Sequence, residues 1–122
     1  ALSYKLLNED GLVENEAHEM KLDESKVTVT EDFFDKDAYI FENIGCREVS
    51  IQADGKAAVT VTFDAPVFGL WSPVGKKVPF ICIEPWYGRA DAADFDGNLQ
   101  KRAWQNELEP GKIFEKAYTI AF

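Results

Sequence analysis

The residue of this sequence best suited to chemistry is a carboxylate beside aromatic rings. Glu84 follows the apolar run Phe80–Ile83 and precedes Trp86 and Tyr87. A carboxylate at the end of an apolar strand is partly desolvated, which raises its pKa and makes it a better general base near neutral pH. The aromatic faces could stack on a ring-shaped ligand. The alternative is a structural glutamate whose charge is paired with Arg89 or with a lysine.

A second group of carboxylates precedes the apolar segment Ala38–Phe41. Asp32, Asp35 and Asp37 cluster there, at the entrance to an expected strand. Carboxylates at such a position can accept hydrogen bonds from sugar hydroxyls. For Asp32 and Asp35 we favour the simpler interpretation that they are ordinary loop residues.

Neither a metal nor a cofactor is predicted. The acidic loop Arg89–Asn98 lacks the ligand spacing and terminal glutamate of a calcium loop, so we expect it to be solvated. A single histidine and two cysteines cannot supply the four ligands of a usual zinc site. His18 lies in an acidic stretch, and we expect it to be exposed rather than to act as a base or ligand.

The charge of the chain excludes several classes of partner. The 122 residues carry a net charge of −9, which disfavours nucleic acids and anionic membrane surfaces. No apolar run is long enough to span a bilayer and no leader peptide is visible, so a cytoplasmic location is expected. Cys46 and Cys82 fit small buried apolar residues of a reducing compartment, with a disulfide between them left open.

The dominant hydrophobic period is two, which is the period of a β-strand. Alternation over 47–52 and 57–63 flanks Asp54-Gly55, a strong signal for a hairpin turn. Further strands are expected over 112–122, 79–84, 67–71 and 38–42, and one helical turn over 30–34 capped by Thr30. No segment is predicted to form a helix of typical length. The pattern predicts an all-β, antiparallel, sandwich-like fold, with residues 1–122 as a single domain.

Several segments together resemble the aldose 1-epimerase (galactose mutarotase) family, and its bacterial LacX-like branch most of all. The most specific is the Phe-Ile-Cys-Ile-Glu-Pro-Trp-Tyr-Gly run over 80–88, followed by Leu-Glu-Pro-Gly over 108–111. Weaker matches lie upstream, in order along the chain, over 8–12, 34–41 and 68–72. The resemblance therefore extends over nearly the whole chain.

The resemblance implies a β-supersandwich that interconverts the α and β anomers of a monosaccharide without a metal or cofactor. By position in the matched segments, Glu84 would be the catalytic base and Asp37 would hold sugar hydroxyls. Trp71 and Trp86 lie where aromatic residues that contact the sugar would be expected. Ring opening needs a base at the O1 proton and an acid at the ring oxygen.

The sequence departs from the family in one respect, because the histidine that serves the family as general acid has no match here. His18 does not lie in a matching segment. We therefore interpret residues 1–122 as the C-terminal half of a mutarotase-like sandwich, poorly active alone, whose partner is the missing N-terminal half. Two other hypotheses remain: a non-catalytic carbohydrate-binding β-sandwich, and an all-β assembly module in which Glu84 is structural.

Overall fold

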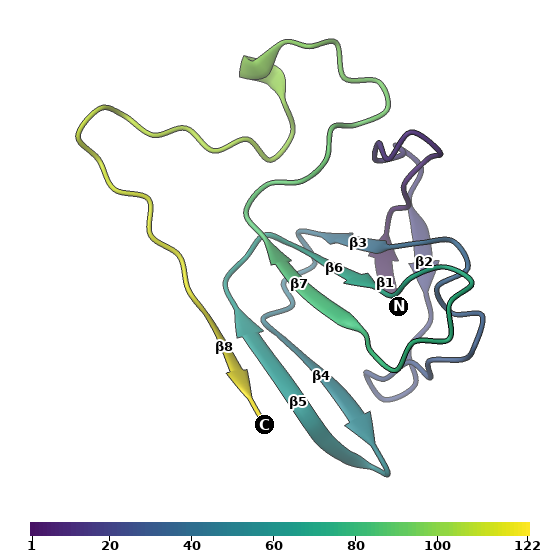
Figure 1. The fold of residues 1–122 in the computed structure, drawn as a ribbon. Coiled ribbons are helices and arrows are strands. Elements are labelled where there is room, and N and C mark those ends of the chain that lie inside the picture. The colour runs from purple at the N-terminus through teal and green to yellow at the C-terminus, as the bar shows by residue number, and fades with distance from the viewer.

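The structure is a computed structural model that describes residues 1–122, and nearly all of its regular structure is β-strand (Figure 1). The strands are β1 (Leu2–Tyr4), β2 (His18–Met20), β3 (Tyr39–Glu42), β4 (Glu48–Ala53), β5 (Lys56–Phe63), β6 (Val67–Trp71), β7 (Cys82–Trp86) and β8 (Tyr118–Ala121). The short 3-10 helix η1 (Leu99–Lys101) lies in the long connection between β7 and β8. No helix is long and apolar enough to cross a membrane.

The strands form three antiparallel sheets. One sheet has the order β3-β6-β7, a second has the order β4-β5-β8, and β1 pairs with β2. The all-β, antiparallel fold predicted from the sequence is confirmed. The two three-stranded sheets are joined through a core cluster that contains Phe41 and Phe68 from one sheet and Val61 and Phe63 from the other.

The hairpin of β4 and β5 forms as the sequence predicts. Asp54 and Gly55 at its turn have φ angles of 51° and 75°, the left-handed conformation that a tight hairpin requires. Val49 pairs with Val61 and Ile51 with Val59, so the apolar residues of both strands share one face. A register shift follows between Ile51 and Gln52. Period-two patterning predicted this pair of strands because both are amphipathic and adjacent in sequence.

Other expected elements differ in extent. The strand predicted over 112–122 is restricted to β8, because only Tyr118–Ala121 finds a partner, in the last four residues of β5. The strand predicted over 79–84 starts later, at Cys82, which is opposite the last residue of β6. It continues through Pro85, which an edge strand tolerates because one side of its backbone needs no hydrogen bond.

The expected helical turn is wrong, two short strands are additional, and the cysteines are less buried than expected. Residues 31–36 form successive turns rather than a helical turn, although the Thr30 hydroxyl does bond the side chain of Asp32 at 2.5 Å. The strands β1 and β2 were not predicted, since three residues are too few to show a period. Cys46 and Cys82 are free thiols, and no disulfide joins them. Both are half-buried rather than buried as expected.

Candidate functional site

Glu84 and Trp86 lie two residues apart on β7, so their side chains project from the same face of the strand. The indole Nε1 of Trp86 donates a hydrogen bond of 3.1 Å to Oε2 of Glu84. Both residues are half-buried. This contact orients the carboxylate and leaves its Oε1 atom available to another donor.

The position of the Trp86 ring depends on Gly69 of the neighbouring strand β6. Gly69 is opposite Glu84 in the ladder, and a Cβ atom placed on it would approach the Trp86 ring to 2.8 Å. The indole therefore lies directly over a backbone position that has no side chain. We did not single out Gly69 from the sequence, although a glycine inside a strand pattern often marks such a close approach.

Asp37 and Trp71 form a second pair of carboxylate and indole. The Nε1 atom of Trp71 donates a hydrogen bond of 2.6 Å to Oδ1 of Asp37, across 34 positions of sequence. Asp37 has a φ of 67°, an uncommon conformation that Asp tolerates better than most residues. Its backbone N–H closes the preceding turn on the carbonyl of Phe34 at 3.0 Å. The turn thus places the carboxylate beside β6.

The two pairs lie on one face of the β3-β6-β7 sheet. In the β6–β7 register Trp71 is opposite Cys82 and Gly69 is opposite Glu84, so Trp71 and Glu84 share a face on adjacent strands. The structure therefore places all four predicted site residues, Asp37, Trp71, Glu84 and Trp86, at the same face. Burial, together with the nearby charge of Glu84, raises the pKa of the Cys82 thiol on this face.

The other candidates from the sequence do not join this face. His18 is on β2, opposite Tyr4, and its ring stacks on the Tyr4 ring with centroids 5.4 Å apart. We expected His18 to be exposed, but it is half-buried, and its Nε2 atom is buried without a hydrogen-bond partner. Asp35 is exposed in the loop that lines a cavity of about 650 Å³ near Pro73–Ile81, away from Glu84.

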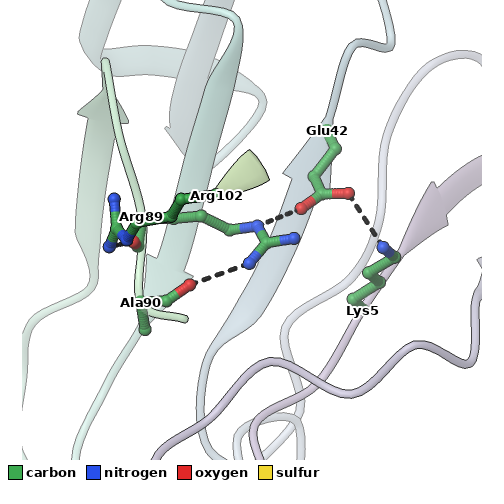
Figure 2. A network of polar contacts seen from close by, with 5 residues as sticks. All are labelled: Lys5, Glu42, Arg89, Ala90 and Arg102. Atoms are coloured by element: carbon green, nitrogen blue, oxygen red, sulfur yellow. Dashed lines mark hydrogen bonds and ion pairs between the residues drawn. The ribbon is translucent and has the colours of Figure 1, made fainter. Parts of the chain in front are cut away.

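An ion-pair network surrounds Glu42 (Figure 2), which is opposite Val67 in the sheet that also carries Glu84 and Trp86. The Arg89 guanidinium donates to Glu42 through Nε and to the carbonyl of Ala90 through Nη1 at 2.8 Å. Lys5 reaches the other oxygen of Glu42 at 3.1 Å. The Arg89 side chain is only 4% exposed and that of Glu42 15%. The alternative ion pair between Glu84 and Arg89 is therefore not formed, because Arg89 pairs with Glu42.

This network joins three separate parts of the chain. Glu42 ends β3, Lys5 follows β1, and Arg89 follows β7. Burial acts to raise the pKa of Glu42, but the hydrogen bond from Lys5 and the charge of Arg89 outweigh it and lower that pKa below its ordinary value. Arg102 extends the network by bonding the Arg89 carbonyl at 2.7 Å and the Asp91 carboxylate at 2.5 Å. The segment after Trp86 is thereby held against β3.

Carboxylates flanked by indoles are side chains suited to hydrogen-bonding hydroxyl groups and to accepting a proton. Each carboxylate has one oxygen engaged by an indole and one oxygen left for a hydroxyl, and the two indoles add apolar surface beside them. No group of three or more His, Cys, Asp or Glu side chains lies close enough to hold a metal ion. One cavity is lined by residues 29–35 and 72–81, and another by residues of β4 and β6. Neither cavity includes Glu84 or Asp37.

Comparison with known proteins gives one informative relationship. No protein-family model matches the chain, and no curated protein is significantly similar to it. A crystal structure of a galactose mutarotase-related enzyme from Lactobacillus acidophilus matches 98% of this chain, with a TM-score of 0.81 and 32% sequence identity. The match spans 41% of that enzyme's chain.

This similarity confirms the resemblance to the galactose mutarotase family. The chain is similar in fold and sequence to part of a galactose mutarotase-related enzyme, and it spans about two fifths of that enzyme's length.

Proposed function

We propose that this chain forms the base-bearing part of an aldose 1-epimerase-like isomerase, with Glu84 as the general base. The proposal is based on one observation: Glu84 and Asp37, each hydrogen-bonded by an indole, lie on one face of the β3-β6-β7 sheet. The proposal is also supported by the similarity to a galactose mutarotase-related enzyme. The substrate proposed is a free aldose in its ring form.

In this mechanism Glu84 accepts the proton of the anomeric O1 hydroxyl. A general acid protonates the ring oxygen as the C1–O5 bond breaks, which gives the open-chain aldehyde. Rotation about the C1–C2 bond and reclosure on the other carbonyl face give the opposite anomer. Asp37 holds ring hydroxyls by hydrogen bonds, while Trp71 and Trp86 fix the two carboxylates and contact the sugar. His18 is on another sheet, so we propose that the acid comes from outside these residues.

The test uses a longer chain in which residues 1–122 replace the matched stretch of the Lactobacillus acidophilus enzyme. Mutarotation of α-galactose is followed by polarimetry, and binding by saturation-transfer NMR. The Glu84→Gln variant should lose mutarotation by a factor of about 10² to 10⁴, as expected for removal of a general base, and should still bind galactose. The matched control is Glu31→Gln, an exposed carboxylate that pairs with Lys77 and not with any of the four site residues. A Glu84→Gln rate near that of the parent would contradict the proposal.

The second candidate is a non-catalytic carbohydrate-binding β-sandwich. It is favoured by the two indoles beside the carboxylates and by the position of the only histidine off this face. It predicts galactose binding that Asp37→Asn weakens, with no acceleration of anomer exchange. Asn tolerates the positive φ of residue 37, so this substitution tests the carboxylate and not the loop.

A further inference from the structure

The third tryptophan of the chain lies on the same side of the β3-β6-β7 sheet as the proposed site. Ile40 is opposite Gly69 in the ladder and Gly69 is opposite Glu84, so Ile40 and Glu84 share a face. Trp104 packs against the buried cluster that contains Ile40, and Trp86 packs against the same cluster. All three tryptophans of the sequence are therefore found on this side of the sheet.

Trp104 differs from the other two tryptophans in what its ring nitrogen does. Trp71 and Trp86 donate their Nε1–H groups to carboxylates of the chain. Trp104 is half-buried, but its Nε1 atom donates to no other atom of the chain. The one side-chain nitrogen or oxygen that is both buried and unpaired is Nε2 of His18, so Nε1 of Trp104 must reach solvent. This indole therefore holds a free donor that a ligand oxygen could accept.

The backbone holds Trp104 in an uncommon conformation. Its φ is 58°, in the left-handed region that a bulky residue rarely adopts. Two residues before it, Arg102 donates to the carbonyl of Arg89 at 2.7 Å. Two residues after it, Asn106 donates to the carbonyl of Tyr87. Both carbonyls belong to the segment that follows β7, so Trp104 is fixed relative to the strand that carries Glu84. Residues held in such conformations are concentrated at sites that contact ligands.

We propose that Trp104 is a further ligand-contacting residue of the Glu84 site, where its indole donates a hydrogen bond to an oxygen of the bound monosaccharide. The carboxylates of the site accept hydrogen bonds from hydroxyls, and the other two indoles have already used their donors. Trp104 supplies the free N–H that the other site residues lack, and its ring adds apolar surface for the C–H groups of the sugar. This inference rests on the proposed function for the place and the ligand, and not on the role of Glu84 as a base.

The experiment follows each indole of the isolated chain by itself. The chain has three tryptophans, so its proton–nitrogen correlation NMR spectrum contains three indole N–H signals, and Trp104→Phe identifies one of them by its loss. Titration with D-galactose and with D-glucose should move the Trp104 signal and slow the exchange of its proton with water. These two sugars are the probes because the proposed ligand is a free aldose.

The substitution Trp104→Phe also tests the hydrogen bond through affinity. It keeps an aromatic ring and removes the donor, so it should weaken sugar binding by about 2- to 10-fold, the range for loss of one hydrogen bond. Saturation-transfer NMR measures the affinity. The matched control is Phe114→Leu, on the same connection between β7 and β8. Phe114 is 49% exposed and packs on the Tyr87 ring rather than on the cluster, so its replacement should leave the affinity unchanged.

Two results would overturn the inference. One is a Trp104 signal that neither sugar moves, because Trp104 would then be a packing residue only. The other is a Trp104→Phe affinity equal to that of the parent. The proposed activity fails separately. In the longer chain described above, Trp104→Phe should raise KM and leave kcat nearly unchanged, whereas Glu84→Gln should lower kcat. Absence of mutarotation there, with the sugar-dependent shift of the Trp104 signal retained, would count against the activity alone.

Discussion

The indole Nε1 of Trp86 donates a hydrogen bond of 3.1 Å to Oε2 of Glu84, two residues earlier on the same strand. This spacing places both side chains on one face, and the ring fits there because Gly69 lies beneath it. The orientation of the proposed base is therefore set by its own strand and by the absence of a side chain on the next one.

Replacing Trp86 with Phe should test this hydrogen bond separately from the packing of the ring. The substitution keeps an aromatic ring over Gly69 and removes the donor to Glu84, so we expect a loss of unfolding free energy of about 1 kcal/mol. Urea denaturation measures it. Trp104→Phe is the control, because Trp104 packs against the same Val13–Ile40–Val67 cluster without bonding Glu84. Equal losses in the two variants would show that the hydrogen bond adds no stability.

Gly69→Ala should displace the Trp86 ring. The added methyl group would lie 2.8 Å from that ring, well inside van der Waals contact, so we expect a destabilisation of about 1–3 kcal/mol and a shift in tryptophan fluorescence. The matched control is Gly88→Ala, where the nearest atom is 3.5 Å away and the methyl group has room. Unchanged fluorescence in Gly69→Ala would mean that the ring does not depend on this glycine.

Glu42→Gln should be strongly destabilising. The Arg89 side chain is 4% exposed, and the substitution removes the carboxylate that neutralises it. We expect a loss of about 3 kcal/mol, as for other buried charges left without a partner. Glu31→Gln breaks the ion pair with Lys77, whose two side chains are both exposed, and should cost less than about 0.5 kcal/mol. Chemical denaturation of both variants gives the comparison, and similar losses would refute the role of burial.

The same carboxylate should make stability depend on pH. The pKa of Glu42 in the folded protein lies below its ordinary value of 4.5. Its ionised form therefore stabilises the folded state above pH 4.5, and that contribution is lost as the pH falls through the lower folded pKa. We expect the unfolding free energy to decrease below pH 4.5 and the decrease to be smaller in Glu42→Gln. Parallel pH profiles for the two proteins, measured by urea denaturation, would exclude Glu42 as a source of the effect.

Local patterns in the sequence predicted the features that depend on neighbouring residues. The hairpin of β4 and β5 follows from alternation on both sides of Asp54-Gly55, and β6 follows from a short apolar run. The position of Glu84 at an apolar strand beside aromatic rings is also a local property. Period two and turn chemistry act over a few residues, so one sequence is enough to read them.

Only the tertiary structure decided which of these residues meet. Trp71 bonds Asp37 across 34 positions, and Arg89 pairs with Glu42 rather than with Glu84. Strand order and register determine these contacts, because they bring distant segments to one face, and no local period encodes them. The same reason explains why β8 is shorter than its alternating pattern: a strand forms only where another strand offers its hydrogen bonds, and here that is the end of β5.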